Sequence, residues 1–338
     1  MLKIGIICPS EIAFRRFMPS LEKIEGIEFV GLGVPTVDER FGKDIPDEEI
    51  ANKIIQEERD KALAHIDQFG GKIFEGYSTI ASSSEIDALY IPLPPALHFQ
   101  WAKFALENGK HVLVEKPSTI SASNSAELVK IARSKGLALH ENYMFQFHEQ
   151  LKVIKEIVDS GEIGDVRLYR LAFGFPKRAA GDFRYLKALG GGSLLDAGGY
   201  TVKYATMLLG ETAKIAYSQL NYTDEYDVDL YGSAAMVNDQ GTVAQLAFGM
   251  DNNYKNELEV WGSEGTIYSG RVLTAPEGFI PNMIIRKGNE EEDRNLPADD
   301  TFAKSIKYFL DCIFDEEIRN ESYQMVVKQA EMIGEFYK

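Results

Sequence analysis

Short apolar runs alternate with segments of helical periodicity in the first part of the chain. The runs at 2–7 (LKIGII) and 27–34 (IEFVGLGV) are typical of buried strands. Between them, apolar residues at Ile12, Phe17 and Leu21 follow the spacing of a helix. The pattern therefore predicts a β-α-β unit at the start of the chain.

The same alternation continues to about residue 145. DALYIPL (87–93) and HVLVEKP (111–117) are predicted strands, and a helix-like segment, HFQWAKFALENG, separates them. SASNSAELVKIARSKG (121–136) predicts a further helix before the strand LALHENY (137–143). Because strands alternate with helices, residues 1–145 are expected to form a doubly wound parallel sheet.

Beyond a predicted helix near 148–160 the pattern changes to longer strands in which apolar and polar residues alternate. These strands are DVRLYRLAFGF, KIAYSQLNYT, YGSAAMVND, GTVAQLAFGM and NELEVWGSEGTIYS. A period of two favours an antiparallel sheet with one buried face. Helical periodicity returns over 301–337. Residues 146–338 are therefore predicted to form a second domain of the α+β class.

Length and charge narrow the classes of function. A chain of 338 residues exceeds the size at which a single core stops growing, which favours two domains. The 52 acidic and 36 basic residues give a formal charge of -16, which disfavours nucleic acid and anionic membrane surfaces as partners. No stretch has the length of a membrane span or the pattern of a secretory signal, so a cytoplasmic location is expected.

The cysteines and histidines do not indicate a metal or a disulfide. Cys8 and Cys312 lie near opposite ends of the chain and are expected to be buried thiols. The five histidines lack the spacing of metal ligands. Metal catalysis is therefore not expected.

The first strand-to-helix turn is where a dinucleotide would place its pyrophosphate, but the usual G-x-G-x-x-G/A pattern reads C-P-S-E-I-A. Cys8 and Ser10 stand where the first two glycines would be, and Ala13 suits the third position. Pro9 removes one backbone donor. Ser10 is expected to cap the helix and to offer its hydroxyl to a phosphate.

Two later segments carry the residues best suited to chemistry. Glu115 and Lys116 end a predicted strand, where open α/β sheets bind their ligands, and a lysine is costly to bury there without a function. The alternative reading is a lysine that only pairs with Glu115. In DFRYLKALGGGSLLDAGGY, three glycines precede a helical run that sets Asp196 and Tyr200 one turn apart on the same face.

The spacing of EKP, ENYMFQFH and GGGSLLDAGGY resembles the family of glucose-fructose oxidoreductase, inositol dehydrogenase and rhizopine-catabolism proteins (Gfo/Idh/MocA), over nearly the whole chain. The resemblance implies an N-terminal Rossmann domain that binds NADP or NAD. It also implies a C-terminal domain with a large, mostly antiparallel sheet that shapes the sugar site. Tyr200 stands where many members have histidine, as in the tyrosine-type branch that includes certain nucleotide-sugar ketoreductases.

The resemblance also assigns roles to particular residues. Lys116 and Tyr200 are the expected acid-base pair, because a phenol beside an ammonium group readily gives up its proton. Asp196 is a further catalytic candidate, and Arg184 and Asp196 are expected to contact substrate or to hold the site through charge-assisted hydrogen bonds. The residues expected near the cofactor are Cys8, Pro9, Ser10, Ile12, Ala13, Arg59, Leu93, Pro94, His98, Glu115, Lys116 and Tyr143. Packing alone is the alternative role of Tyr143.

An insertion separates the second strand from the helix that usually follows it. The segment GVPTVDERFGKDIPDEEIANKIIQEERDKA adds roughly twenty residues around 37–57. Arg59 resembles the family's ribose-reading arginine and favours NADP slightly over NAD. The insertion is compatible with a solvated helix, a subunit contact or a lid.

The resulting hypothesis is an NAD(P)-dependent oxidoreductase that acts on a sugar or sugar derivative, with a nucleotide-sugar ketone among the candidates. A trans-dihydrodiol dehydrogenase-like activity and a non-catalytic sensor of cofactor or sugar stay open as alternatives. Because the family often associates through its C-terminal sheet, a homodimer or homotetramer is expected.

Overall fold

The computed structural model describes residues 1–43, 45–179 and 181–338, so Asp44 of the insertion lies outside the described residues. These residues form two compact units. The first contains Met1–Asn142 together with Phe302–Val327, and the second contains Tyr143–Thr301 together with Lys328–Lys338.

The first unit is built on a six-stranded sheet in the order β3-β2-β1-β4-β5-β6, in which every neighbouring pair is parallel. Its strands are β1 (Leu2–Ile7), β2 (Ile27–Val34), β3 (Lys72–Glu75), β4 (Ala88–Ile91), β5 (His111–Val114) and β6 (Leu139–Glu141). The central strands are buried along most of their length, as parallel strands covered on both faces must be. The doubly wound sheet predicted from the alternating pattern is confirmed.

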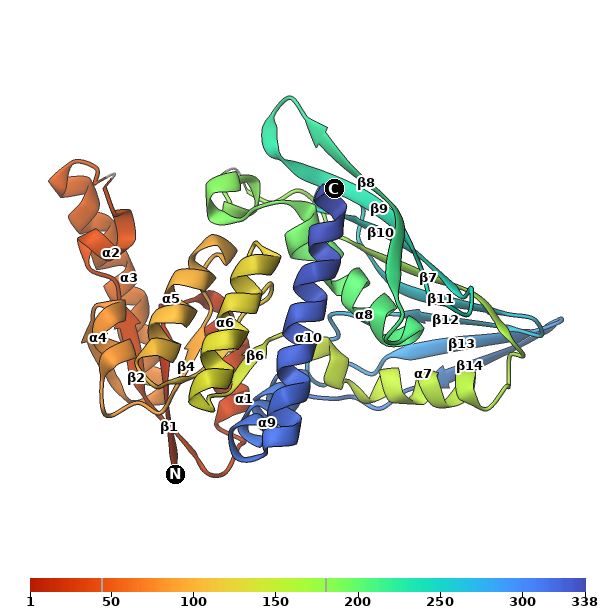
Figure 1. The fold of residues 1–338 in the computed structure, drawn as a ribbon, viewed down its shortest axis with the longest axis horizontal. Helices are drawn as coiled ribbons and strands as arrows, with labels where there is room; N and C mark the ends of the chain where they lie inside the picture. The colour runs from red at the N-terminus through yellow and green to blue at the C-terminus, as the bar shows by residue number, and fades with distance from the viewer. Residues whose placement is uncertain (44, 180) are drawn as a thin grey trace. The chain divides into compact units, whose positions relative to one another are not determined.

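Helices cover both faces of this sheet. The helices are α1 (Met18–Leu21), α2 (Val37–Phe41), α3 (Glu48–Phe69), α4 (Tyr77–Ser82), α5 (Pro95–Glu107) and α6 (Ala122–Lys135). Figure 1 shows α4, α5 and α6 side by side on one face, while α3 packs against β2 and β3 on the other. The Ser121 side chain caps α6 and Gly136 ends it in the left-handed conformation, as predicted.

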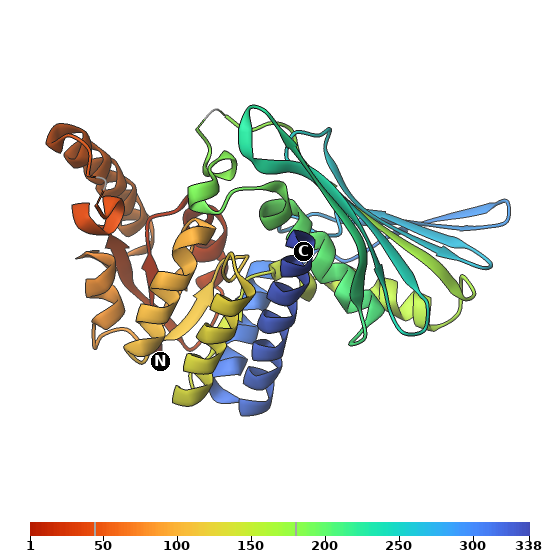
Figure 2. The same ribbon diagram turned by 45° about the horizontal axis from the view of Figure 1, so that its top comes forward.

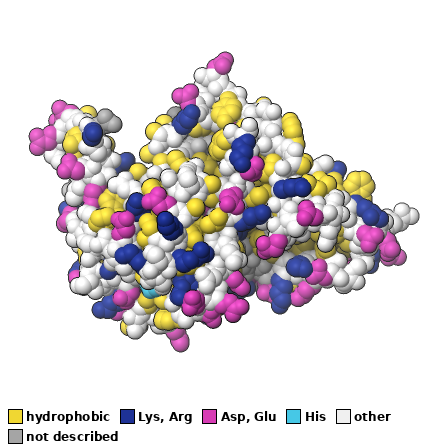
Figure 3. Space-filling view, in the orientation of Figure 1, with side chains coloured by type: hydrophobic (Ala, Val, Ile, Leu, Met, Phe, Trp, Pro, Cys, Tyr) yellow, Lys and Arg dark blue, Asp and Glu magenta, His cyan; other side chains and the backbone are white. Residues whose placement is uncertain are grey.

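The insertion forms helix. It contains α2 and the first turns of α3, which is 22 residues long. Acidic side chains gather over the outer end of these two helices (Figure 3), as expected for a solvated face.

The second unit contains an eight-stranded sheet in the order β14-β13-β12-β11-β7-β10-β9-β8. Its strands are β7 (Val166–Gly174), β8 (Lys214–Thr223), β9 (Tyr226–Val237), β10 (Val243–Gly249), β11 (Lys255–Gly262), β12 (Thr266–Gly270), β13 (Asn282–Lys287) and β14 (Glu290–Asn295). All neighbouring strands are antiparallel except β10 and β7, which are parallel. The predicted mostly antiparallel sheet is confirmed.

One face of this sheet is covered and the other is open. Figure 2 shows α7 (Glu149–Asp159) and α8 (Gly199–Leu209) along one face, and no helix among the described residues lies on the opposite face. The covered face holds the main core of the unit, which includes Leu171, Leu246 and Val260. This arrangement explains why the strands alternate buried and exposed residues.

The final helices α9 (Thr301–Phe314) and α10 (Glu316–Gly334) return to the first unit over residues 302–327. The sequence division into 1–145 and 146–338 did not anticipate this return. Its physical basis is a set of buried hydrogen bonds to β6 and the residues just before it: Tyr323 donates to the Leu137 carbonyl oxygen and Ser322 to that of Leu139.

Both cysteine thiols are free and buried. No described helix combines the length and apolar character that a bilayer crossing requires. Among the described residues, acidic, histidine and cysteine side chains form no group that could hold a metal ion.

Candidate active site

The first strand-to-helix turn keeps a glycine-like backbone without its glycines. Cys8 has a φ of 79°, in the left-handed region that glycine occupies without steric cost. The Ser10 hydroxyl accepts a hydrogen bond from the Ala13 amide at 3.1 Å, so the predicted helix cap is present. Ala13 is fully buried, as close helix–strand packing at the third position requires. The turn therefore suits a dinucleotide phosphate despite its sequence.

Two predicted cofactor segments are tied together by His98. Its ring nitrogens lie 2.7 Å from the Pro117 carbonyl oxygen and 2.7 Å from the Leu93 carbonyl oxygen. Burial lowers the pKa of His98 to about 4, although the hydrogen bonds to the two carbonyl oxygens oppose this shift. His98 thus connects the turn after β4, which contains Leu93 and Pro94, to the turn after β5. A direct contact between His98 and a cofactor stays a prediction.

The Glu115 carboxylate is held at the end of β5 by donors from the two neighbouring strands. The Tyr90 hydroxyl in β4 donates to its Oε1 at 2.6 Å, and the Asn142 amide, one residue beyond β6, donates to the same oxygen at 2.7 Å. Burial raises the pKa of Glu115, while these two donors and the charge of Lys116 oppose the rise. Glu115 and Lys116 are therefore electrostatically linked at the carboxyl edge of the sheet.

Arg59 reaches the carboxyl edge of the same sheet from α3. Its guanidinium pairs with the Glu75 carboxylate at 2.5 Å, and Glu75 ends β3 opposite Val34, the last residue of β2. In doubly wound folds the ribose is recognised after the second strand. The position of Arg59 is therefore compatible with its predicted role, which stays a prediction.

Glu39 in the insertion is engaged by the protein itself. Its carboxylate accepts hydrogen bonds from the backbone amides of Thr36, Tyr77 and Ser78 and from the Ser78 hydroxyl. Burial alone would raise the pKa of Glu39, but these donors hold it below its ordinary value. Glu39 thus caps α4 and joins it to α2.

The second group of site residues begins at the glycine-rich segment of the second unit. The Asp229 carboxylate on β9 accepts from the Ser193 hydroxyl at 2.6 Å and from the Leu194 amide at 2.7 Å. Burial raises the pKa of Asp229, and these donors oppose the rise. A Cβ on Gly192 would lie 2.5 Å from Asp229 Oδ1, so the glycine is required for this approach. Asp229 fixes the start of the helix that carries Asp196 and Tyr200.

Asp196 lies in a π-helical turn, Leu194–Gly198, which continues directly into α8. Such turns are rare in proteins overall, and those that occur are often found at functional sites. The Arg184 Nε lies 2.6 Å from Asp196 Oδ2, and Arg184 also pairs with Asp182 at 3.2 Å. The predicted charge-assisted contact between Arg184 and Asp196 is present.

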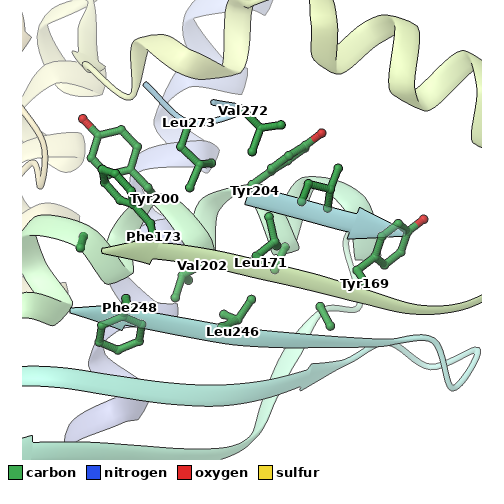
Figure 4. Packing of buried hydrophobic residues seen from close by; sticks show 14 of the residues in the cluster. Tyr169, Leu171, Phe173, Tyr200, Val202, Tyr204, Leu246, Phe248, Val272 and Leu273 are labelled. Carbon is green, nitrogen blue, oxygen red and sulfur yellow. The ribbon is translucent and has the colours of Figure 1, made fainter. Parts of the chain in front are cut away.

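Aromatic rings surround the Tyr200 side chain. Tyr143 and Phe173 each contact its ring edge-to-face with centroids 5.2 Å apart, and Phe145 lies at 5.6 Å. In Figure 4 the ring lies against Phe173 and its hydroxyl points away from the apolar side chains. Tyr143 is fully buried and packs within this cluster, in line with the packing role left open for it. The contacts hold the ring in place, and the role of its hydroxyl stays a prediction.

Contacts join His98 to Leu93 in the first unit, and Arg184 to Asp196 and Tyr143 to Tyr200 in the second. Sequence reasoning found the residues at strand ends and helix starts, but it missed Tyr90, Asn142 and Asp229. Tyr90 carries a polar group within the fully buried strand β4, and Asp229 is a buried acid in the alternating strand β9, and this was the available signal. Lys116 belongs to the first unit and Tyr200 to the second.

The chain is similar to known proteins over both units. Residues 27–143 match the model of the oxidoreductase family with an NAD-binding Rossmann fold, and residues 151–268 match the GFO/IDH/MocA C-terminal domain. The dTDP-3,4-didehydro-2,6-dideoxy-alpha-D-glucose 3-reductase of Actinomadura kijaniata is 34% identical, over 98% of this chain and 93% of that protein. The enzyme of the same name from Streptomyces violaceoruber is 36% identical, over 92% of this chain and 85% of that protein.

A solved structure is similar over the same extent. The 3-ketoreductase from Actinomadura kijaniata, crystallised with NADP and TDP-benzene, has a TM-score of 0.89 and 34% identity, covering 98% of this chain and 96% of that one. Family models and near full-length relatives thus agree on both units. The chain belongs to the Gfo/Idh/MocA family and is an oxidoreductase that uses NADP or NAD.

Proposed function

We propose that the protein reduces the keto group of a nucleotide-linked sugar, with Tyr200 as the proton donor and Lys116 as its electrostatic partner. The observation that carries this proposal is the way in which neighbouring groups position Lys116 and Tyr200. Lys116 follows a carboxylate fixed by two hydrogen bonds, and Tyr200 is held by aromatic rings on a capped helix. The near full-length relatives that reduce dTDP-linked keto sugars support the same substrate class.

The chemistry requires one hydride and one proton. When bound, the nicotinamide supplies the hydride to the carbonyl carbon. The Tyr200 hydroxyl gives its proton to the carbonyl oxygen, so that the ketone becomes an alcohol and the tyrosine a phenolate. The ammonium group of Lys116 stabilises the negative charge that develops on these oxygens. Asp196 orients the substrate together with its partner Arg184.

The first turn, the segments after β4 and β5, and Arg59 form the proposed cofactor site. The residues are Cys8, Pro9, Ser10, Ile12, Ala13, Arg59, Leu93, Pro94, Glu115 and Lys116, with His98 connecting two of the segments. We favour NADP, because Arg59 provides a cation beside the end of β2 that suits a 2'-phosphate.

The segment after β7 is basic and suits an anionic substrate. Although the chain has a formal charge of -16, this segment carries Lys177, Arg178, Arg184 and Lys187 within eleven residues. Arg184 is engaged by Asp182 and Asp196, and Lys177 by Glu225. We propose that this basic segment meets the diphosphate of the nucleotide sugar, a group that a dihydrodiol lacks.

A titration experiment tests the cofactor and the substrate class together. Calorimetry with NADP, NAD and dTDP should give the tightest binding for NADP, and dTDP should bind the protein–NADP complex. Steady-state turnover of NADPH with a dTDP-linked keto sugar should exceed that with a dihydrodiol and NADP. Folded protein that binds neither nicotinamide cofactor would overturn the proposal. Binding without turnover of any keto sugar would favour the sensor alternative.

We further propose that two copies associate through the open face of the eight-stranded sheet, and that the protein works in the cytoplasm. Large side chains are exposed on this sheet, with Tyr217 at 61%, Tyr231 at 48% and Trp261 at 48%. Exposed apolar patches of this kind favour a protein partner. The two free, buried thiols suit a reducing compartment.

A further inference from the structure

A chain of buried hydrogen bonds runs from the C-terminal helix α9 to the carboxylate beside Lys116. The Ser305 hydroxyl on α9 donates to Asn142 Oδ1 at 2.7 Å, and the Asn142 amide nitrogen donates to Glu115 Oε1 at 2.7 Å. His140 Nε2 lies 3.1 Å from the Ser305 hydroxyl oxygen. His140, Asn142 and Ser305 are each only 1% exposed. All members of this chain lie in the first unit.

The donors in this chain all point the same way. The Ser305 hydroxyl has one proton, and it goes to Asn142 Oδ1, so the contact with His140 requires Nε2 to donate. Because Oδ1 of Asn142 is taken by Ser305, its amide nitrogen must face Glu115. Every group therefore presents a proton toward the carboxylate, which opposes the rise in the pKa of Glu115 that burial causes.

We propose that Asn142, oriented by Ser305 and His140, is a positioning residue for the turn after β5, which contains Glu115 and Lys116. By holding the Glu115 carboxylate in place, it fixes the group next to Lys116 in the chain. The inference rests on the proposed function for the role of Lys116, but not for the geometry of the chain. Without Ser305, the Asn142 amide is free to rotate and to turn its oxygen toward the carboxylate.

Two buried serines provide a matched pair of variants. Ser305 and Ser322 are each 1% exposed, on α9 and α10. The Ser322 hydroxyl donates to the Leu139 carbonyl oxygen at 2.9 Å and approaches His140 Nδ1 only at 3.5 Å. Ser305→Ala breaks the chain to Glu115, whereas Ser322→Ala removes a buried hydroxyl of the same kind outside it. A purely structural role predicts similar effects from both.

The first readout is kinetic. In Ser305→Ala we expect kcat with a keto sugar to fall about tenfold, with KM and the NADP dissociation constant within about twofold of wild type. Asn142→Asp places a second carboxylate against Glu115, so kcat should fall further in this variant, by about a hundredfold. Ser322→Ala should keep the wild-type kcat. Equal kcat losses in the two serine variants, or none in Ser305→Ala, would overturn the proposal.

The second readout is the acylation rate of Lys116 by acetic anhydride, followed by mass spectrometry with Lys110 as an internal reference. Lys116 in an ordered turn is less open to the reagent than Lys116 in a turn whose Glu115 carboxylate has lost its support. Ser305→Ala should therefore raise the relative rate at least about threefold, and Ser322→Ala should leave it unchanged. An unchanged rate in Ser305→Ala contradicts the inference. This readout remains decisive if no keto sugar is reduced, an outcome that would count against the proposed function alone.

Discussion

The side chain of Tyr200 is held in place by neighbouring side chains more than by the helix that carries it. Tyr143 and Phe145 from one segment and Phe173 from β7 contact its ring, and the edge-to-face pairs with Tyr143 and Phe173 add roughly 0.5–1.5 kcal/mol each beyond burial. A phenol held in one orientation loses little entropy when it donates a proton. Removal of its oxygen should therefore change the chemistry and not the packing.

At this scale the account predicts that Tyr200→Phe and Lys116→Ala each lower kcat at least roughly a hundredfold, because each removes a general acid-base contribution. Affinity for NADP should change much less. The measurement is steady-state kinetics with the keto sugar beside calorimetry with the cofactor. Wild-type turnover in both variants would remove the assigned roles.

Residue types and spacing were enough to predict the groups that do chemistry, but not the groups that hold them. Lys116 and Tyr200 stand at a strand end and in a helix after glycines, which are local features. Asn142 and Asp229 act on residues 27 and 35 positions away. Such partners are set by strand order, which a single sequence does not reveal.

Gly199 begins α8. Replacing it by alanine would have two opposing effects on stability, a gain in helix propensity and a loss from overpacking. A Cβ at this position would lie 2.1 Å from the Tyr143 hydroxyl oxygen. Replacing glycine by alanine within a helix gains up to about 1 kcal/mol, whereas overpacking costs about 1–3 kcal/mol. Gly199→Ala should therefore lower the free energy of unfolding in a denaturant titration. In the Tyr143→Phe background the loss should shrink, and an equal loss in both backgrounds would show that the clash is not the cause.

Glu39 joins α2 to the start of α4, and its contribution should depend on pH. Its folded-state pKa lies below the ordinary value of 4.5, so its stabilisation is present above that pH and is lost as the pH falls through the folded pKa. Glu39→Gln should cost about 1 kcal/mol at pH 7, a modest value because the carboxylate is only half-buried. The gap from wild type should narrow below pH 4.5. A gap that stays constant with pH in thermal unfolding would refute the role of the charge.

Elements were predictable where their burial pattern was regular. The strands β1, β2 and β8 begin and end at the residues expected from the apolar runs. The strands β3, β13 and β14 were not anticipated. In β3 only Phe74 is buried between charged ends, and every residue of β14 is charged or polar. β14 is an edge strand, and charged edge strands resist unwanted pairing.

The periodicity of the sequence also could not show that the chain returns to the first unit after the second sheet. An apolar stripe on a helix reveals that one face is buried, but it does not reveal which sheet covers it. The helices α9 and α10 follow the second sheet in sequence, yet residues 302–327 belong to the first unit. The contacts with the first unit include apolar packing of Tyr323 and Val326 in its core and the hydrogen bond from Tyr323 to the Leu137 carbonyl oxygen.

At the scale of the assembly, the open face of the eight-stranded sheet carries a testable consequence. Trp261→Glu and Tyr231→Glu place charges on exposed aromatic positions and should shift the protein toward monomers in sedimentation velocity. Ile120→Glu, a control at a residue 42% exposed in the first unit, should leave the assembly intact. If all three variants sediment like wild type, a different surface mediates association or the protein is monomeric.

The central claim is that this chain reduces a nucleotide-linked keto sugar through Tyr200. The most direct test is the consumption of NADPH by the wild-type protein and by Tyr200→Phe, with a dTDP-linked 3-keto sugar as substrate. The account predicts one NADPH oxidised for each keto group reduced, and a rate at least roughly a hundredfold lower in the variant at equal cofactor occupancy. No NADPH consumption by folded, cofactor-bound wild type, or equal rates in the two proteins, would contradict it.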